Sequence, residues 1–305
     1  MDLLLKLRDK ELLRKIRFLV DGVIVGYKFT SDFNYNLDDL KEIKDYCTTH
    51  GLKYYIVMDD FISESEITEL DEYLGFVKEL NVDGIYFHDL GVYYGAIQYN
   101  LVDKLIYDGY TVLCNGLDSF FFLSQGVNSV VLSRELTIKE IAKIIKNNER
   151  CISIQAFGHL RMSYSKRKFL TNYFNEINKE IDYLDKDNIS LVEESRNYKL
   201  PVKETKYGTN IYTDYILLMY EEFVYLRSLC KRVIVDNEFI SNDVLFDVLR
   251  DFRRLNENNA EFLKESLIQR YPDYSFATGY LYQKTVNRKE ENEQDWTIST
   301  SKRFS

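Results

Sequence analysis

The chain has 305 residues, of which 29% are charged and 45% are hydrophobic, counting Ala, Val, Ile, Leu, Met, Phe, Trp, Tyr and Cys. This balance excludes a disordered chain, and the length excludes a small fold that needs disulfides or metals to stay folded. The formal charge of −9 repels polyanions overall, so any contact with nucleic acid requires a local basic patch.

Short apolar, β-branched runs alternate with helical patterns along the chain. Apolar residues at helical spacing predict helices over Leu37–Cys47, Glu66–Leu80 and Thr137–Ile145. Capping-box patterns at Ser63–Glu66 and Thr137–Glu140 fit these helix starts. We predict eight strands, at Leu3–Leu5, Asp21–Gly26, Lys53–Met58, Asp83–Phe87, Thr111–Cys114, Ser129–Leu132, Ile152–Gln155 and Arg232–Asp236. Most of these strands lie about 20 to 30 residues apart, so the sequence predicts an α/β fold of the (β/α)8 TIM-like barrel type.

The connection between the last two predicted strands is far too long for one helix and its loops. Alternating patterns at 188–193, 199–203 and 208–212 predict a small strand insertion followed by a helix. Beyond the barrel, a helix is predicted at 246–268 and a terminal strand or hairpin at 274–286. We therefore expect a barrel over 1–240 that includes an inserted segment 157–230, a C-terminal extension packed on the barrel over 241–290, and a polar tail at 291–305.

The sequence indicates a cytoplasmic protein. The N-terminus lacks the basic region followed by a long apolar region that an export signal requires. No segment of the sequence approaches the roughly 18 apolar residues of a membrane span. Four cysteines, Cys47, Cys114, Cys151 and Cys230, are scattered with no C-x-x-C pair and no histidine at metal-finger spacing. We therefore expect reduced thiols and no metal site.

In a βα barrel, the functional face lies where the strands end. An imidazole oriented by a carboxylate can perform acid–base chemistry, but acidic residues at strand ends equally well cap the following helices. Among these residues, we predict catalytic roles for His88, Arg134, Glu135 and His159. Substrate-binding roles are predicted for Lys28, Asp89, Asn115 and Gln155, while Asp59, Asp60 and Asp236 are further candidates at the same face.

For each catalytic candidate, a purely structural role is the alternative. His88 either projects into the barrel mouth or packs in the core, and His159 follows Gly158, where the backbone can approach a ligand closely. Arg134 and Glu135 form either an ion pair within the protein or part of a clamp for phosphate or carboxylate. No G-x-S-x-G elbow or activated cysteine is visible, so a conventional nucleophilic hydrolase is not supported.

The densest basic cluster contains Arg161, Lys166, Arg167 and Lys168, interleaved with aromatic residues. On an acidic protein, such a cluster can hold the phosphates of RNA. The alternative is the solvated start of a helix.

Several segments together resemble the collagenase-like peptidase family U32. They include Val131–Ile141 with its Leu-Ser-Arg-Glu-Leu motif, Ile154–Met162 and Ser165–Phe174. Shorter pieces at 191–196, 200–202, 208–212 and 278–285 agree, so the resemblance spans nearly the whole chain. It implies a barrel-only member acting in tRNA modification, namely prephenate-dependent 5-hydroxylation of the wobble uridine in low-GC Gram-positive bacteria.

Departures from the family pattern affect the expected cofactor and roles. Many relatives hold an iron–sulfur cluster through cysteines where this chain has Lys166-Arg167-Lys168, so no cluster is expected, and prephenate is the implied co-substrate. Gln155 replaces a family glutamate, whereas Asn115, Arg134 and Glu135 match and His159 aligns with a family histidine. The implied partners are tRNA and either a U32 paralogue or a second copy.

Three function classes remain open. The first is a tRNA hydroxylation subunit, the second a non-catalytic RNA-binding or scaffold subunit, and the third a peptidase, as the family name implies. Peptidase chemistry requires an activated nucleophile or a metal-bound water, and the sequence offers neither.

Overall fold

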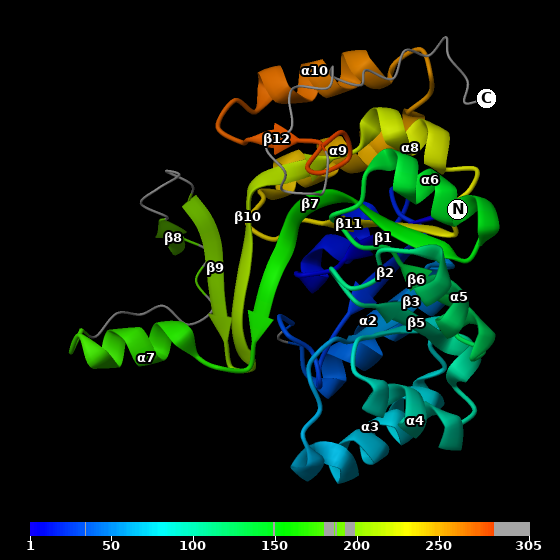
Figure 1. Ribbon diagram of the computed structural model, residues 1–305, viewed down its shortest axis with the longest axis vertical. Helices are drawn as coiled ribbons and strands as arrows, with labels where there is room; N and C mark the ends of the chain where they lie inside the picture. Colours follow the sequence, from blue (N-terminus) through cyan, green and yellow to red (C-terminus); the bar gives the residue numbers. More distant parts are fainter. Residues whose placement is uncertain (34, 149, 180–185, 187, 193–198, 284–305) are drawn as a thin grey trace.

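A closed barrel of eight parallel strands forms the body of the protein in a computed structural model that describes residues 1–33, 35–148, 150–179, 186, 188–192 and 199–283 (Figure 1). The strands pair in chain order, and the last one, β11, pairs with both β1 and β7, which closes the barrel. The barrel strands are β1 (Asp2–Lys6), β2 (Gly22–Val25), β3 (Lys53–Met58), β4 (Gly84–Phe87), β5 (Leu105–Asp108), β6 (Ser129–Val131), β7 (Ile152–Ser165) and β11 (Arg232–Asp236). The predicted (β/α)8 fold is confirmed.

Helices connect successive strands and cover the barrel. They are α1 (Leu13–Ile16), α2 (Leu37–His50), α3 (Ile67–Leu80), α4 (Leu90–Gln98), α5 (Gly116–Ser124), α6 (Ile138–Asn147), α8 (Tyr220–Leu226) and α9 (Asn242–Arg254). Short 3-10 turns lie at Lys10–Leu12, Glu64–Glu66 and Val102–Lys104. Both predicted capping boxes are present, at Ser63–Glu66 and Thr137–Glu140. In the described part of the chain, no helix is long and apolar enough to cross a membrane.

The prediction of the fifth strand at Thr111–Cys114 is wrong. The strand is Leu105–Asp108, which pairs with β4 and β6, whereas Thr111–Cys114 lies in the turn that follows. Tyr110 has a φ of 55°, which ends the extended backbone, and Val112 is 59% exposed. The run Thr111–Cys114 has the residue types of a strand but no neighbouring strand to cover it. The residue at the end of the fifth strand is therefore Asp108.

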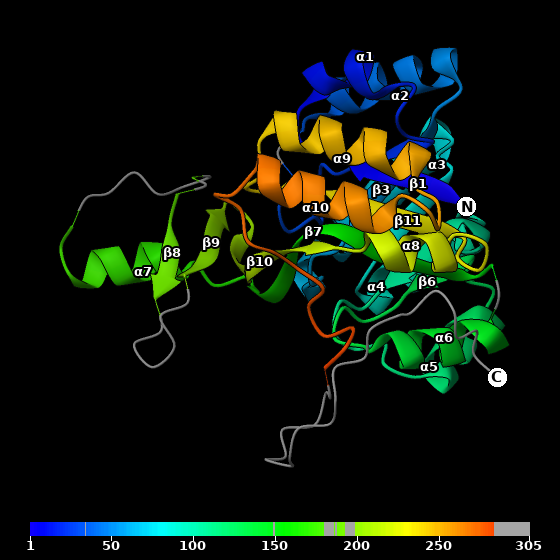
Figure 2. The ribbon, with the colours of Figure 1, turned by 90° about the horizontal axis from the view of Figure 1, so that it is seen from above.

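The predicted strand insertion is confirmed, and β7 carries it. Beyond its barrel half, β7 continues to Ser165 and pairs antiparallel with β10 (Gly208–Leu218), which pairs with β9 (Lys199–Thr205) and then β8 (Ser190–Val192). Together with α7 (Phe169–Glu176), these strands project from the barrel as an arm (Figures 1 and 2). The arm starts at the rim where the barrel strands end.

Gly158 marks the point where β7 leaves the barrel. Its φ is +114°, and a Cβ there would lie 2.2 Å from the carbonyl oxygen of Asp236. A glycine is therefore required, because the backbones of β7 and β11 approach too closely for any side chain. The sequence predicts that the backbone at Gly158 can approach a ligand closely, but in the structure it approaches the neighbouring strand β11.

The C-terminal extension differs from the prediction. Instead of one helix over 246–268, α9 ends at Arg254 and α10 (Ala260–Arg270) follows after a turn at Asn256–Asn259. Of the two alternatives predicted over 274–286, the terminal strand is present as β12 (Phe276–Ala277), which has only two residues and pairs parallel with β10, while residues 284–286 lie outside the described residues. The predicted polar tail lies outside the described residues.

Two apolar cores hold the barrel. The larger packs the helices against the outer faces of the strands, and the smaller fills the barrel interior. The interior core includes Leu4, Ile24, Tyr55, Val57, Tyr86, Ile106, Val131 and Ile234. Since strand side chains alternate between two faces, the residues two positions further along these strands face the barrel mouth.

We predict that Gly158→Ala destabilises the protein severely. The added Cβ meets the Asp236 carbonyl and the positive φ is strained for alanine, so the free energy of unfolding should fall by about 3 kcal/mol or more. Gly51→Ala is the control, because Gly51 also has a positive φ but its Cβ would have no neighbour within 4 Å; its cost should be about 1 kcal/mol. Equal losses in urea titrations of the two variants would contradict this account.

Candidate functional site

The barrel mouth is built from buried charged residues. Two positions beyond the interior core along β1, β3, β5 and β11 are Lys6, Asp59, Asp108 and Asp236, all less than a tenth exposed. Three arginines from other segments, Arg8, Arg134 and Arg161, reach these aspartates. Buried charges require partners, and here each aspartate has an arginine.

Arg134 forms the pair at β5. Its guanidinium binds both carboxylate oxygens of Asp108, with Nη2 at 2.8 Å from Oδ2, and its Nε donates to Gln155 Oε1 at 3.3 Å. Its carbon Cζ also lies 4.6 Å from the ring centroid of Tyr110. Arg134 therefore forms an ion pair within the protein, as one of the two alternatives predicted, but its partner is Asp108 and not the adjacent Glu135.

Arg161 forms the pair at β3. Its Nη1 lies 3.1 Å from Asp59 Oδ2 and also contacts Ser31, and the guanidinium stacks 3.4 Å from the Tyr110 ring centroid. The Tyr110 hydroxyl donates to the same Asp59 carboxylate. Tyr110 therefore lies between two arginines and shares an aspartate with one of them.

Arg8 forms the pair at β11 and gathers three carboxylates. Its Nη2 lies 2.9 Å from Asp236 and 3.0 Å from Asp32, and its Nη1 contacts Glu238. Lys6 adds a contact of 3.3 Å between Nζ and Asp236 Oδ2. The three pairs and Lys6 together line the mouth.

The neighbouring cations keep the three aspartates ionised. Burial alone raises the pKa of a carboxyl, but Arg161 and Lys6 lower the pKa of Asp59 below its usual range, and Arg134 does the same for Asp108. Arg8 and Lys6 lower the pKa of Asp236. Glu238 is different, because burial outweighs its cations and raises its pKa. An anion entering this mouth would have to replace a carboxylate on an arginine.

The two candidate histidines lie near the mouth with main-chain partners. The Nδ1–H of His159 donates to the Thr213 carbonyl at 2.7 Å, and Nδ1 of His88 donates to the Asp108 carbonyl at 3.1 Å. His159 is 9% exposed, and burial lowers its pKa. His88 packs against Phe61 and Tyr110.

The other predicted site residues separate into two groups. Gln155 lies in the mouth, where its amide donates to the carbonyls of Phe157 and His159. Asp89 and Asn115 are N-caps of α4 and α5, Glu135 is exposed, and Lys28 pairs with Glu69 on α3. The helix-capping alternative is therefore the observed geometry for Asp89 and Asn115.

The four residues of the basic cluster lie in different environments. Arg161 is buried in the mouth, and Lys166 binds Glu66 at 2.9 Å and the Phe61 carbonyl at 2.7 Å. Arg167 and Lys168 are exposed at the base of the arm, and neither side chain forms an ion pair with a described residue. These two residues are the accessible part of the cluster.

Several mouth residues escaped sequence analysis, namely Lys6, Arg8, Asp32, Asp108 and Tyr110. Lys6 continues the inward alternation of Leu4, a signal that could have been read. Asp108 was missed because the fifth strand was predicted too late in the chain. Arg8, Asp32 and Tyr110 lie in loops, where no periodicity marks them.

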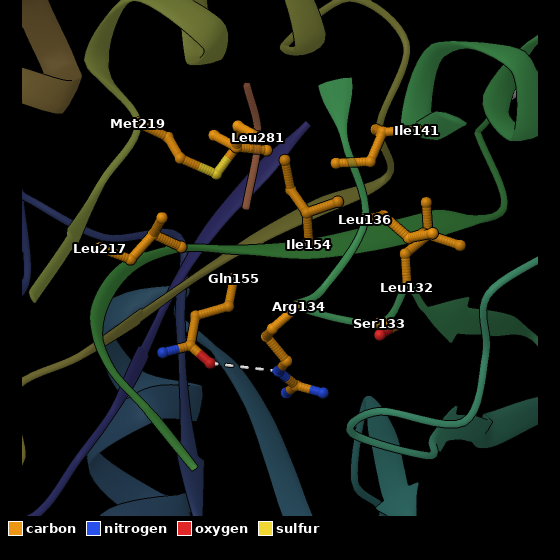
Figure 3. A pocket seen from close by; sticks show the side chains of 10 residues that line it. All are labelled: Leu132, Ser133, Arg134, Leu136, Ile141, Ile154, Gln155, Leu217, Met219 and Leu281. Atoms are coloured by element: carbon orange, nitrogen blue, oxygen red, sulfur yellow. Dashed lines mark hydrogen bonds between the residues drawn. The ribbon is translucent and has the colours of Figure 1, made fainter. Parts of the chain in front are cut away.

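A small pocket adjoins the Arg134 pair. Figure 3 shows Arg134 and Gln155 joined by their hydrogen bond and pointing away from a group of apolar side chains. That group is Leu132, Leu136, Ile141, Ile154, Leu217, Met219 and Leu281. The pocket therefore has an apolar wall and a polar end at Arg134.

No three His, Cys, Asp or Glu side chains of the described residues form a group that could hold a metal ion. All four cysteines are free, and burial raises the pKa of Cys47 and of Cys230 to about 12. These two thiols are protonated at neutral pH, which makes them poor ligands.

Comparison with known proteins identifies the family. The model of peptidase family U32 matches residues 12–299. The chain belongs to peptidase family U32. It is 27% identical over 287 residues to tRNA hydroxylation protein P2 of Bacillus subtilis, an alignment that covers 88% of this chain and 91% of that protein.

Two further relatives carry the peptidase name. The uncharacterized protease MJ0090 of Methanocaldococcus jannaschii is 29% identical over 147 residues, covering 46% of this U32 chain and 35% of that protein. The solved structure of the U32 peptidase Mk0906 superposes with a TM-score of 0.49 at 14% identity, covering 77% of this chain and 91% of that one.

Among the described residues of this U32 protein, no histidine forms a hydrogen bond with the side chain of a serine, threonine or cysteine. Its three histidines are all described, and their Nδ1 atoms contact the carbonyls of Tyr46, Asp108 and Thr213. The described residues therefore contain no nucleophile activated by a histidine.

We predict that acidification destabilises this U32 protein partly through His159. Burial puts the folded pKa below the ordinary 6.5, so below pH 6.5 the unfolded chain binds the proton more readily. The contribution of neutral His159 is complete above pH 6.5 and is lost as the pH falls through the folded pKa. Between pH 7.5 and 5.5, His159→Gln should therefore lose less stability than the wild type.

The measurement is urea unfolding of both proteins across this pH range. The comparison at pH 8, where the histidine is neutral in both states, isolates the packing cost of the substitution. Parallel stability curves for the two proteins below pH 7 would contradict the assignment.

Proposed function

We propose that this chain acts in tRNA modification as a tRNA hydroxylation protein that helps convert the wobble uridine to 5-hydroxyuridine. The observation that carries the proposal is the alignment with tRNA hydroxylation protein P2, which extends over nine tenths of both proteins. A family match from residue 12 to 299 supports the same assignment. The reaction would take place in the cytoplasm, where tRNA is found.

The proposed small-molecule co-substrate is prephenate, an anion with two carboxylates. The mouth suits such an anion, because Arg134 already holds a carboxylate with two parallel hydrogen bonds. A carboxylate of prephenate would compete with the Asp108 carboxylate for the Arg134 guanidinium. Gln155 and Tyr110 lie within hydrogen-bond or stacking reach of the same guanidinium.

The proposed tRNA contact is the exposed basic pair Arg167 and Lys168. Both lie between the barrel mouth and α7, so a backbone held there would pass the mouth. The protein is acidic overall, and such a local contact is the way a polyanion can bind it.

The residues present do not fit the iron–sulfur cluster of many relatives. Lys166-Arg167-Lys168 occupies the stretch that carries ligands in those proteins, and Cys47 and Cys230 are buried thiols. We therefore propose that the protein works without a cluster of its own. Anaerobic purification with stoichiometric iron and sulfide would contradict this.

The decisive experiment is mass spectrometry of tRNA nucleosides from a strain that lacks the gene. The strain should lose 5-hydroxyuridine, and expression of the wild-type chain should restore it. Unchanged 5-hydroxyuridine in the deletion strain would refute the proposed function. Restoration by a protein with Arg134 and Tyr110 both replaced by alanine, at wild-type abundance, would instead favour a scaffold that works without its mouth.

We predict that Arg134→Lys abolishes 5-hydroxyuridine in the complemented strain while tRNA binding stays nearly unchanged. A lysine cannot reproduce the two parallel hydrogen bonds of the guanidinium. Arg232→Lys is the matched control, because Arg232 is also buried in the barrel but lies at the opposite end, bound to Tyr55, Ser129 and Asn128. Melting temperatures of both variants show how much protein is folded. Equal 5-hydroxyuridine levels in the two variants would exclude a specific role for Arg134.

We predict that Arg167→Ala with Lys168→Ala weakens tRNA binding. Loss of two phosphate contacts should lower the slope of log Kd against log salt by up to about two. The charge-matched control is Lys143→Ala with Lys146→Ala on α6, which lies far from α7 in both views (Figures 1 and 2). Fluorescence titrations with tRNA at several salt concentrations test this. An unaltered slope in the first variant would mean that the basic pair is only solvated surface.

A further inference from the structure

Helices α4 and α5 leave an apolar face uncovered on the outside of the barrel. On most barrel helices, the outer side is polar, but here six large apolar side chains are each about half or more exposed. They are Leu90 (51%), Tyr94 (67%) and Ile97 (47%) on α4, and Leu117 (80%), Phe120 (64%) and Phe121 (55%) on α5. We call these six residues the α4–α5 face.

These two barrel helices carry almost no charge. None of the nine residues of α4 is charged, and α5 has one charged residue among nine, Asp118. The Asp118 carboxylate accepts a hydrogen bond from the Asn115 amide at 2.7 Å, at the start of the helix. By contrast, α2 carries six charged residues among fourteen. A helix surface meant for water would carry such charges.

The exposed side chains form two neighbouring ridges. On α4 they are spaced i, i+4 and i+7, and on α5 i, i+3 and i+4, so each set lies along one side of its helix. The two helices are adjacent, because the Tyr93 hydroxyl on α4 donates to the Gln125 carbonyl at the end of α5. Figures 1 and 2 place both helices on the same side of the barrel.

The size of the α4–α5 face matches one half of a stable interface. Aromatic side chains present about 150 to 250 Å² when fully exposed, and leucine and isoleucine lie near the lower end of this range, so the six exposed fractions correspond to on the order of 550 to 750 Å². The largest apolar patch on a typical monomer is about 300 to 600 Å², and a standard interface buries about 800 Å² per partner.

We propose that the α4–α5 face is a dimer interface that binds the same face of a second copy of this chain. A face without charge is complementary to itself, whereas most other surfaces of a chain with a net charge of −9 repel their own copies. In a two-fold dimer, the two ridges of one copy would pack against those of the other as a layer of four helices. This proposal does not depend on the tRNA function.

The face reaches the mouth end of the barrel, because Leu90 is the first residue of α4 and Leu117 is the second residue of α5, and these helices follow the ends of β4 and β5. A second copy bound there would border the rim of the mouth on the side of β4 and β5. It would lie away from the arm, which leaves the rim at β7.

The test is sedimentation velocity of the full chain over a range of concentrations. The wild type should be a dimer at about 10 µM, since interfaces of this size bind with micromolar or tighter affinity. Tyr94→Glu combined with Phe120→Glu should raise the dissociation constant at least about 100-fold, because each places a charge at the centre of the apolar layer. Both side chains are mostly exposed, so the variant should keep the wild-type melting temperature.

The matched control is Phe18→Glu combined with Phe262→Glu. These aromatic residues are 78% and 68% exposed but lie outside the α4–α5 face. The control should remain a dimer. A wild type that stays monomeric at about 100 µM would overturn the proposal and leave a different protein as the occupant of the face. A folded Tyr94→Glu, Phe120→Glu variant that dimerises like the wild type would also overturn it.

Discussion

Pairing between buried arginines and aspartates at the barrel mouth is the interaction on which the candidate site depends. Asp59, Asp108 and Asp236 lie at the ends of β3, β5 and β11 and face the barrel mouth. From other segments, Arg161 pairs with Asp59, Arg134 with Asp108 and Arg8 with Asp236. A buried charge without a partner costs several kcal/mol, so each residue of these pairs requires the other. The chain segments that carry the arginines are thereby fixed to the barrel. The turn after β6 and the outer half of β7 meet at Tyr110, whose ring contacts both Arg134 and Arg161.

This arrangement joins the arm to the barrel. Arg161 lies on the part of β7 beyond Gly158, where the strand has left its parallel neighbours and pairs with β10. Its ion pair with Asp59 therefore links the insertion to β3 across the mouth. In the proposed function, the same arginines bind the anionic co-substrate. Binding would therefore leave the displaced aspartate buried without its arginine, so it would need a compensating cation such as Lys6 or protonation of that aspartate.

The barrel was predictable because each strand is a short apolar run buried on both sides, and seven of the eight runs lie where the sequence indicates. The fifth failed because Thr111–Cys114 has strand-like residues but is held in a turn after Tyr110. That error hid Asp108, the partner of Arg134. Sequence analysis placed Arg161 in an exposed basic cluster, since charge runs are usually solvated, but only Arg167 and Lys168 are free of partners among the described residues. Which arginine meets which aspartate depends on contacts between residues up to 228 positions apart, and no local pattern records them.

A double-mutant cycle on Arg161 and Asp59 tests the central claim most directly. The free energy of unfolding is measured for Arg161→Met, Asp59→Asn and the double variant. Each single change should cost about 3 to 5 kcal/mol because it leaves a buried charge unpaired, and the double variant should cost much less than the sum. A coupling energy of about 2 kcal/mol or more would support the mutual dependence of the pair. Additive losses within about 0.5 kcal/mol would contradict it.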